Sequence, residues 1–305
     1  MDWIVEKEWA GLSLKQVLRR EMGLSTKLIK HLKFSEGGIL VNGAHVTVRH
    51  TLAKGERLSL ALEDREAAPI EPVDLPITVL YEDDDLVVPA KPAEMPTQPS
   101  HGHWSDTVAN ALVYRYESRG VPFVFRPINR LDRNTSGLLL VARNRHAAGV
   151  LSGAMCRGEI QKTYLAVLDG VLDTESGRID APLHRTRESI IVREVCSPDA
   201  PDADAALTEY RVLARSGHHT LVEARPITGR THQLRVHFAH LGHPITGDDL
   251  YGAASDEIAR HALHARTLTF PHPTTGERMT LKAPLPADLE ALLRLHFPSL
   301  APDAL

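Results

Sequence analysis

Residues 130–140 constrain the fold more than any other part of the chain. They place one acid, Asp132, in a polar turn that ends at Gly137. A wholly apolar run, residues 138–142, follows directly, and such a run bounded by turn residues predicts a strand buried on both faces of a sheet. Asp132 is therefore expected at the mouth of a core strand, where a rigid support can hold a catalytic side chain. Because aspartate is also a common turn residue, a purely structural role for Asp132 stays open at this point.

The charge of the chain is unevenly distributed. Its 305 residues have a formal net charge of −4 and are 43% hydrophobic and 24% charged, which is ordinary for a globular protein and long enough for about two domains. Residues 1–62 hold ten Lys or Arg against six Asp or Glu, a net of +4, so the remainder carries −8. A basic terminal segment on an acidic body predicts a separate attachment module.

Cysteine usage and hydropathy restrict the class of protein. Cys156 and Cys196 are the two cysteines and form no CxxC pair, which argues against a zinc cluster or a disulfide framework and favours a reducing compartment. No apolar run approaches the ~18 residues of a membrane span, and the first residues lack the pattern of a signal peptide. We therefore expect a cytoplasmic protein without membrane contact.

The first 62 residues are predicted to form two short helices and a small hairpin sheet. Ser13 can cap a helix that runs to Met22, and Ser25 can cap a second helix. Asn42 and Gly43 stand between two apolar segments, which is a strong signal for a tight β-hairpin.

Lysines follow one flank of the second predicted helix, at Lys27, Lys30 and Lys33. Two helices, a hairpin sheet and these lysines resemble the alpha-L RNA-binding module over residues 11–62, and that resemblance implies RNA binding. Lysines contact mainly phosphate, so they would give affinity that falls with salt. A solvated helix face is the alternative explanation for the same three residues.

A change of composition separates this module from the rest of the chain. Residues 63–76 are charged and proline-rich, which predicts an extended linker between a module of residues 1–62 and a body of residues 77–305. In the body, one helix is predicted to start at Thr107 and another to be capped by Asn144.

A second informative stretch covers residues 225–242. A helix is predicted after the break at Gly229, and at 100° per residue Arg230 falls on the same side as the apolar Leu234, whereas Arg235 falls well away from it. Arg230 would then be a buried cation at the start of a helix, which is costly without a carboxylate partner. Asp132 is the expected partner.

Histidines and acids in the body raise the question of a metal site. Metal-binding histidines on a helix usually stand four residues apart on one face with an acid nearby, and the helix supplies no such set. The acidic turn of residues 82–85 is expected to be a solvated hairpin turn. We therefore predict no metal, with satisfied or surface side chains at His232, His237, His240 and His243.

Taken in order, four segments of the body resemble the RluA-type family of pseudouridine synthases, in which an N-terminal alpha-L module is common. The resemblance as a whole covers about residues 77–290, and the four segments stand in the order and at the spacing of the family. They are residues 130–142 (RLDRNTSGLLLVA), 162–170 (KTYLAVLDG), 224–252 (ARPITGRTHQLRVHFAHLGHPITGDDLYG) and 263–277 (LHARTLTFPHPTTGE).

The resemblance implies an α+β fold with a long, mixed but mainly antiparallel sheet, flanking helices and an RNA-binding cleft. It implies that a uridine of structured RNA is isomerised to pseudouridine, with Asp132 as the catalytic aspartate, Arg230 as its salt-bridge partner and Tyr164 packing the target base. An isomerisation oxidises nothing, so no cofactor is expected. RNA contacts are further assigned to four arginines, Arg130, Arg133, Arg185 and Arg187.

Some positions depart from the pattern of the family. Asn129 stands where many members have His, and Pro89 and Glu94 replace residues more usual around the Lys-Pro-Ala segment. These differences concern the choice of substrate and not the type of reaction. The N-terminal module favours ribosomal RNA over transfer RNA by association, and we expect a monomer.

Two other classes of function remain to be tested against this hypothesis. The first is a non-catalytic RNA-binding or ribosome-assembly factor, which would leave RNA chemically unchanged. The second is a metal-dependent hydrolase that uses the acidic and histidine-rich segments, which would lose activity with a chelator.

Overall fold

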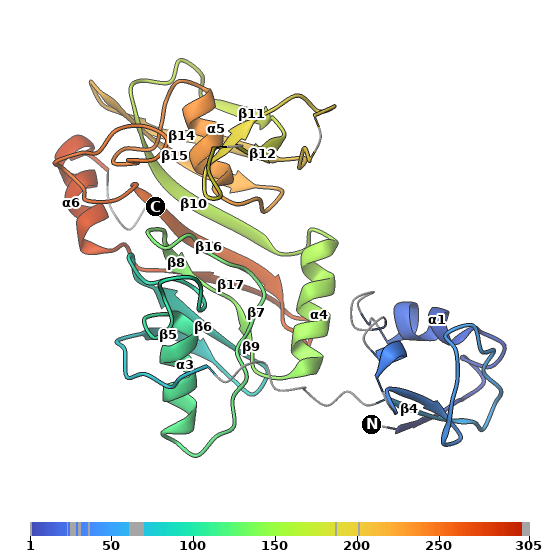
Figure 1. The fold of residues 1–305 in the computed structure, drawn as a ribbon. Helices are drawn as coiled ribbons and strands as arrows, with labels where there is room; N and C mark the ends of the chain where they lie inside the picture. Colours follow the sequence, from blue (N-terminus) through green and yellow to red (C-terminus); the bar gives the residue numbers. More distant parts are fainter. Residues whose placement is uncertain are drawn as a thin grey trace. The chain divides into compact units, whose positions relative to one another are not determined.

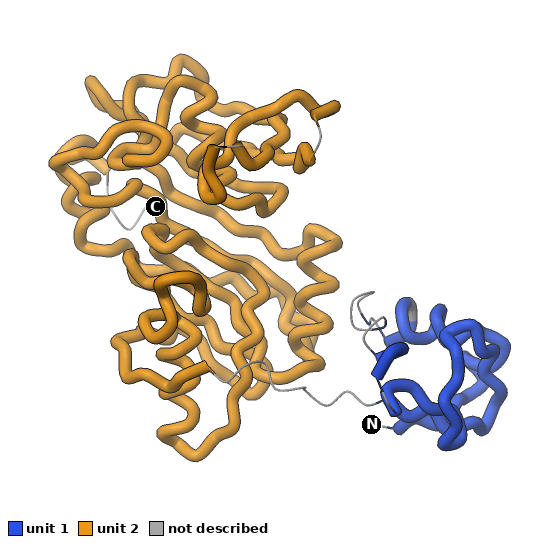
Figure 2. Tube along the Cα trace, viewed as in Figure 1, with its two compact units in different colours: residues 1–69 blue, residues 70–305 orange. Residues whose placement is uncertain are grey.

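The computed structural model describes residues 2–22, 24, 29, 32–35, 37–60, 70–186, 188–200 and 202–300. The chain divides into two compact units, residues 1–69 and 70–305 (Figure 2). Part of the predicted linker, residues 63–69, lies outside the described residues. The remainder of it belongs to the second unit, where Val73 N donates to Asn110 O and Asn110 Nδ2 donates to Glu71 O.

The first unit contains a small antiparallel sheet with the strand order β1-β4-β2-β3. Its elements are β1 (Asp2–Ile4), α1 (Leu14–Gln16), the π-helix η1 (Val17–Glu21), β2 (Ile39–Val41), β3 (Ala44–His45) and β4 (Arg57–Leu60). Ser13 caps α1 in a capping box with Gln16, which confirms the predicted helix start. Asn42 and Gly43 join β2 to β3 with positive φ angles of 51° and 80°, as the predicted tight hairpin requires.

The second predicted helix of this unit lies largely outside the described residues. Ile29 and residues 32–34 are helical, and Ile29 and Leu32 are buried in the core of the unit. Lys27 and Lys30 are not among the described residues, whereas Lys33 is exposed, with Nζ 5.0 Å from the centroid of the Phe34 ring.

The second unit is built on one mixed sheet of eleven strands, nine of which follow the order β11-β14-β15-β10-β16-β8-β6-β9-β7 (Figure 1). β17 joins β16, and β5 joins β6. β8 and β16 pair in parallel, and the other pairs in the described part of this sheet are antiparallel. The strands are β5 (Thr78–Glu82), β6 (Leu86–Lys91), β7 (Arg126–Pro127), β8 (Ser136–Leu138), β9 (Val141–Ala142), β10 (Gln161–Asp169), β11 (Ser176–Asp180), β14 (Leu207–Arg215), β15 (His219–Pro226), β16 (Leu263–Pro271) and β17 (Arg278–Lys282). This is the α+β fold with a long, mainly antiparallel sheet that the family resemblance implied.

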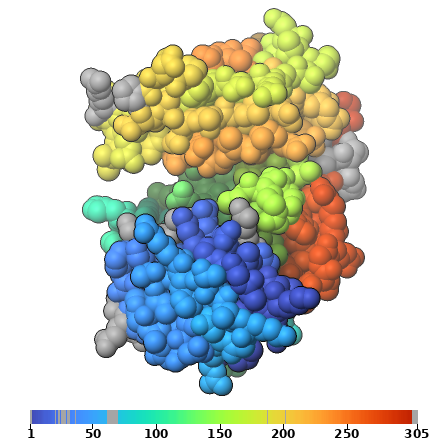
Figure 3. Space-filling model, turned by 90° about the vertical axis from the view of Figure 1, so that its right-hand side faces the viewer, coloured from blue at the N-terminus to red at the C-terminus, as the bar shows by residue number. Residues whose placement is uncertain are grey.

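Helices and a small hairpin flank this sheet. Thr107 caps α3 and Asn144 caps α4, so both predicted helix starts are confirmed. The residues coloured yellow and orange in Figure 3, which include α5, gather in one lobe. The elements are α3 (Val108–Glu117), α4 (Arg145–Cys156), α5 (Gln233–His240), α6 (Ala287–His296) and the hairpin of β12 (Leu183–Arg185) and β13 (Arg193–Val195).

The apolar run at residues 138–142 is buried on both faces of the sheet, as predicted. Leu139 and Val141 belong to the apolar core that includes α3, whereas Leu138 and Leu140 belong to the core that includes α4. The run is not one continuous strand, because β8 ends at Leu138 and β9 begins at Val141.

The side chain of Asn129 fills the interruption between β8 and β9. Its Oδ1 accepts from Leu140 N at 2.7 Å, and its Nδ2 donates to Leu138 O at 3.3 Å. A side-chain amide thus replaces a neighbouring strand at this point, which satisfies buried backbone groups that would otherwise lack partners.

Close pairing of β8 with β16 requires a glycine at position 137. Gly137 has φ +117°, and a Cβ atom built there would lie 2.2 Å from Ala265 O. Both the backbone conformation and the close approach exclude a side chain. Among the described residues, no helix is long and apolar enough to cross a membrane.

Gly137→Ala is expected to destabilise the protein by about 3 kcal/mol or more, because it combines backbone strain with a clash against a core strand. Chemical denaturation followed by far-UV circular dichroism measures the change. The matched control is Gly149→Ala in α4, where a Cβ meets nothing within 4 Å. That change should stabilise the helix by about 0.5–1 kcal/mol. Equal stability of the two variants would contradict the role given to Gly137.

Candidate active site

Asp132 lies in a large cavity on the sheet of the second unit. The cavity has a volume of about 1110 Å³, and Asp132 and Tyr164 both line it. Asp132 is the one acidic residue among the described residues that line the cavity. The basic lining residues are Arg130, Arg133, Lys162, Arg225, Arg230 and Arg235. The site is therefore a positively charged cavity around a single carboxylate, on a unit whose net charge is negative.

Side chains from other segments fix the backbone of residues 131–134. Thr97 Oγ1 donates to Leu131 O at 3.1 Å and accepts from Leu131 N at 3.2 Å. Lys91 Nζ donates to Arg133 O at 2.7 Å. These bonds flank Asp132 on both sides, so its Cα position is set by the strand β6 and by the loop after it.

Lys91 is a buried cation that the sequence did not single out. Its side chain is 1% exposed, and Nζ donates three hydrogen bonds, to the carbonyl oxygens of Pro92, Met95 and Arg133. Burial lowers the pKa of Lys91 to about 7, and the charge of Asp132 opposes this shift. Lys91 thus connects the irregular loop after β6 to the segment that carries Asp132.

Residues 260–261 hold the same loop with a second set of hydrogen bonds. Arg260 Nη1 donates to Asn134 O at 3.1 Å, and the guanidinium also pairs with Asp288 of α6. His261 Nε2 is hydrogen-bonded to Thr135 Oγ1 at 2.8 Å. The segment that follows Asp132 is therefore attached to the residues just before β16 and, through Arg260, to α6.

Arg235 is the cation beside Asp132. Its Nη1 lies 3.7 Å from Asp132 Oδ2. Its Nε and Nη2 donate to the two carboxylate oxygens of Asp248, each at 2.7 Å, and its guanidinium lies 5.0 Å from the Tyr251 ring centroid. Burial lowers the pKa of Arg235. The hydrogen bonds and charge of Asp248, and then the charge of Asp132, outweigh this effect, so the pKa of Arg235 is raised above its ordinary value.

The predicted ion pair between Asp132 and Arg230 is therefore wrong. Arg230 is exposed, with Nη1 3.2 Å from Asp204 Oδ1, and Arg235 is 6% exposed. Arg230 lies before α5, which begins at Gln233 after a left-handed residue at position 232 with φ 58°. Residues 233–238 of α5 are all buried, so the buried part of the helix includes Arg235 as well as Leu234. Arg230 lies in the preceding turn and remains a lining residue of the cavity.

The turn before α5 is built by the side chain of Gln233. Its Oε1 accepts from Thr228 Oγ1 at 2.7 Å and from Arg230 N at 3.0 Å, and its Nε2 donates to Leu207 O at 2.9 Å. A glutamine side chain that accepts from the backbone N–H three residues before it is typical of a helix start, so Arg230 precedes the helix and does not lie within it. The polar run Thr-Gly-Arg-Thr-His before Gln233 was a signal for this turn.

Tyr164 lies in β10 and lines the cavity from the sheet side. Tyr164 is 7% exposed. Burial, and then the negative charge of Asp132, raise the pKa of Tyr164, so its phenol stays protonated at neutral pH. The same electrostatic effect places Asp132 and Tyr164 in one site.

The histidines of the α5 region do not assemble a metal site. His237 is a satisfied core residue, with Nδ1 bonded to Thr208 Oγ1 and Nε2 to Ala181 O, both at 2.9 Å. His232 Nδ1 is bonded to Tyr251 OH at 2.8 Å, and His243 Nδ1 to Asp169 O at 2.9 Å.

Three of the four predicted RNA-contacting arginines can be placed. Arg130 and Arg133 are exposed and line the large cavity, and Arg133 Nε donates to Glu94 O. Arg185 is exposed in β12 and lines a smaller cavity of about 330 Å³ that shares Arg230 with the large one. Arg187 lies outside the described residues.

Solved structures share this fold. The protein described as human RNA pseudouridylate synthase domain containing 1 aligns with a TM-score of 0.60 and 29% identity, covering 74% of this chain and 89% of its own. The human protein described as RNA pseudouridylate synthase domain containing 4 aligns with a TM-score of 0.57 and 25% identity, covering 71% and 91% of the two chains.

The chain belongs to the RNA pseudouridylate synthase family of the RluA type. The family model described as RNA pseudouridylate synthase matches residues 85–240, and the model of the RluD ribosomal pseudouridine synthase N-terminal domain matches residues 1–58. The protein is thus an RNA pseudouridine synthase with an S4-like RNA-binding module at its N-terminal end, which confirms both resemblances seen in the sequence.

Curated relatives cover nearly all of the chain. The uncharacterized RNA pseudouridine synthase YjbO of Bacillus subtilis is 39% identical over 291 residues, which are 94% of this chain and 98% of the relative. Ribosomal large subunit pseudouridine synthase D of Xanthomonas campestris is 37% identical over 274 residues, which are 84% of this chain and 80% of the relative.

The buried histidine that supports the Asp132 loop predicts a specific acid sensitivity. Burial, and then the charge of Arg235, lower the pKa of His261 to about 3, below the value of about 6.5 of an unfolded histidine. Between pH 6.5 and 3 the unfolded chain binds a proton that the folded chain does not, so the stability falls as the pH falls.

We expect the free energy of unfolding to fall more steeply with acid in the wild-type protein than in His261→Gln. The difference in slope is at most about 1.4 kcal/mol per pH unit. Urea denaturation at several pH values between 7 and 4 measures it. His146→Gln, at an exposed position of α4, is the control and should keep the wild-type slope. Identical slopes in wild type and His261→Gln would show that His261 charges in the folded state.

Proposed function

We propose that the protein converts uridine in structured ribosomal RNA to pseudouridine, with Asp132 as the catalytic residue and Arg235 as its ionic partner. One observation carries this proposal: Asp132 is the single acid of a basic cavity, and a buried guanidinium lies 3.7 Å from its carboxylate. A carboxylate placed in this way suits covalent or electrostatic work on a sugar carbon of a polyanion.

The reaction needs only groups that the cavity contains. The N1–C1′ glycosidic bond of uridine breaks, the base turns, and a C5–C1′ bond forms while the proton on C5 leaves and N1 gains one. Asp132 supplies the negative charge that acts on C1′ or on the base when the bond breaks. Arg235 places a positive charge 3.7 Å from that carboxylate, and Asp248 holds the guanidinium in place.

Tyr164 is proposed to pack against the target base. Its aromatic ring faces the same cavity, and neither Asp132 nor Arg235 offers an apolar surface for stacking. Because its raised pKa keeps the phenol protonated, stacking and hydrogen bonding suit Tyr164 better than accepting the C5 proton.

Base flipping is the proposed route by which uridine reaches Asp132. The side chain of Asp132 is 27% exposed, and Asp132 lies next to the strand β8. A base stacked inside an RNA helix could therefore not reach it. Extrusion costs a few kcal/mol, which contacts with the basic lining can offset. A cavity of about 1110 Å³ is larger than the usual ~300–1000 Å³ of a small-molecule pocket, as a flipped nucleotide with its neighbours requires.

Ribosomal RNA is the proposed substrate class, with transfer RNA as the alternative. The N-terminal match is to a domain of a ribosomal pseudouridine synthase, and several relatives are named as ribosomal large subunit enzymes. The protein is proposed to act as a cytoplasmic monomer, since one chain supplies every group of the site. Lys33, Arg130, Arg133 and Arg185 are proposed to contact the RNA backbone.

Asp132→Asn is expected to lower pseudouridine formation by at least about 10³-fold, because the amide keeps the shape of the carboxylate but not its charge. The assay uses total RNA from cells that lack the protein, incubated with purified enzyme and probed by carbodiimide-dependent primer extension. The position restored by the wild-type enzyme identifies the RNA and the uridine.

RNA binding measured by filter retention should stay within about threefold of wild type in this variant, because Asp132 supplies none of the positive charges that bind the phosphate backbone. Full activity of Asp132→Asn would refute its catalytic role. If even the wild-type enzyme restores no site in any RNA, a non-catalytic RNA-binding function is favoured. Cleavage of RNA by the purified protein that a chelator abolishes would instead support the metal-dependent hydrolase.

Arg235→Gln is expected to lower kcat by at least about 100-fold, because it removes the positive charge beside the Asp132 carboxylate. The equivalent variant Arg230→Gln should lower kcat by less than about tenfold. It should act mainly on KM and on the salt dependence of KM, because Arg230 pairs with Asp204 at the rim of the cavity.

Arg235→Gln also leaves Asp248 buried without its cation, which can cost about 3–5 kcal/mol of stability. Denaturation midpoints therefore accompany the kinetics, and Arg235→Lys, which keeps a positive charge, should recover part of kcat. The assignment of Arg235 fails if Arg230→Gln is the more damaging change in kcat.

A further inference from the structure

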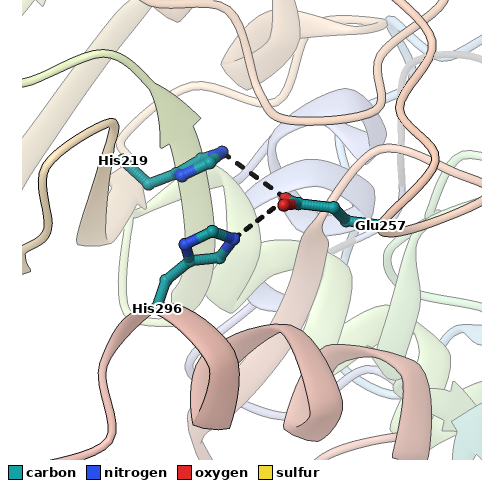
Figure 4. Close-up of side chains that lie close together, drawn as sticks. All are labelled: His219, Glu257 and His296. Atoms are coloured by element: carbon teal, nitrogen blue, oxygen red, sulfur yellow. Dashed lines mark hydrogen bonds and ion pairs between the residues drawn. The ribbon is translucent and has the colours of Figure 1, made fainter.

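Two histidines and a glutamate form a cluster on the second unit, outside the candidate active site. His219 begins β15, Glu257 lies in the loop before β16, and His296 ends α6. Figure 4 shows the two imidazole rings directed at the same carboxylate from two different elements. Three segments that are distant in the sequence thus bring N, N and O donors together.

The distances in this cluster are close to those of a metal site. His296 Nε2 lies 2.9 Å from Glu257 Oε2, and His219 Nε2 lies 3.8 Å from the same oxygen. One ligand atom from each residue falls within 4.8 Å of the other two. Zinc–ligand bonds of about 2.0–2.1 Å in a tetrahedron separate the ligands by about 3.3 Å, and the two distances to the Glu257 oxygen, 2.9 and 3.8 Å, differ from this spacing by about 0.4–0.5 Å.

His219 lacks the hydrogen bonds that a largely buried imidazole normally makes. Its side chain is 12% exposed, and Nδ1 is buried without a partner among the described residues. Its Nε2 approaches only two carboxylates, Asp169 at 3.6 Å and Glu257 at 3.8 Å, both beyond hydrogen-bonding distance. A ring nitrogen that points at two carboxylate oxygens without bonding either is consistent with a missing cation between them.

Hydrogen bonding alone gives a less complete account of the cluster. The 2.9 Å contact between His296 Nε2 and Glu257 Oε2 satisfies those two atoms. The centroid of the His219 ring lies 4.1 Å from that of His296. The pair, however, offers His219 no hydrogen bond, since its Nε2 is 3.8 Å from the Glu257 oxygen. A shared cation would use the Nε2 atoms of both rings, which face Glu257.

We propose that His219, Glu257 and His296 bind a divalent zinc ion, with Asp169 or water as the fourth ligand. Two imidazoles and a carboxylate are a typical ligand set for Zn²⁺, whereas Mg²⁺ and Ca²⁺ prefer oxygen ligands alone. The ion is structural and separate from the isomerisation, because none of its ligands lines the cavity of Asp132.

The position of the cluster indicates what such an ion stabilises. It connects the start of β15 to the end of α6 and to the segment after Glu257. Three residues further on, Arg260 binds both Asp288 of α6 and the carbonyl of Asn134. The ion would therefore fasten α6 to the segment that supports the loop of Asp132.

Zinc binding to the full-length protein tests the proposal. After chelator treatment and buffer exchange, isothermal titration with Zn²⁺ should show one tight site per chain. Co²⁺ in its place should give the strong visible absorption of a tetrahedral complex. At a hundredfold excess of free Zn²⁺ over Kd, the melting temperature should rise by roughly 5–10 °C.

Glu257→Gln and His296→Gln are the test variants, and both positions are partly exposed, so these changes should leave the fold intact. Each should weaken Zn²⁺ binding by more than tenfold and abolish the rise in melting temperature. The controls are His146→Gln and His240→Gln at exposed positions, which report binding to scattered surface histidines.

Tight binding that these controls retain and both test variants lose would support the site. Unchanged zinc affinity in Glu257→Gln and His296→Gln, or the absence of a tight site in the wild-type protein, would overturn it. Pseudouridine formation is not the readout, so failure of the zinc site and failure of the proposed function are independent.

Discussion

The buried guanidinium of Arg235 is the interaction on which the candidate site depends. Removing a cation from water is costly, and Arg235 is 6% exposed. Asp248, which is 0% exposed, offsets this cost with two charged hydrogen bonds of 2.7 Å. The third nitrogen is left to face Asp132 at the longer distance of 3.7 Å. Asp132 therefore receives the benefit of a positive charge without being tied into the bidentate pair, so its carboxylate remains available to a substrate.

The backbone around Asp132 is likewise held by hydrogen bonds, whereas the Asp132 side chain is held by none among the described residues. Neighbouring carbonyl groups are held by Lys91, Thr97 and Arg260, while the Asp132 side chain makes no hydrogen bond described in the structure beyond its ion pair. Fixing the main chain and leaving the functional carboxylate loosely bound preorganises the site without neutralising it. Gly137 has a related role, because its missing side chain lets β8 approach β16 and so sets where the loop of Asp132 ends.

Local sequence patterns predicted those parts of this arrangement that depend on neighbouring residues. The buried run at residues 138–142, the caps at Thr107 and Asn144, and the hairpin at Asn42 follow from short-range steric and hydrogen-bonding rules. The identity of the Asp132 partner could not be obtained in that way. Its prediction assumed a helix from Arg230 with one buried side, but the turn held by Gln233 places Arg230 before the helix, and residues 233–238 of the helix are all buried. Lys91 and Arg260 were missed because their contacts with the loop of Asp132 are to backbone carbonyl groups 42 and 126 residues away, which carry no signal in the sequence.

Charge distribution connects the fold to its RNA substrate. The second unit lies in the part of the chain with a negative net charge, yet six Lys or Arg and one Asp line its large cavity. Such an arrangement concentrates positive potential where a phosphate backbone must enter, while the acidic remainder limits binding of RNA elsewhere on the surface. Within that field a lone carboxylate would repel the substrate unless a cation were fixed beside it. The guanidinium of Arg235, 3.7 Å from Asp132 Oδ2, places a positive charge beside that carboxylate and so lessens the repulsion.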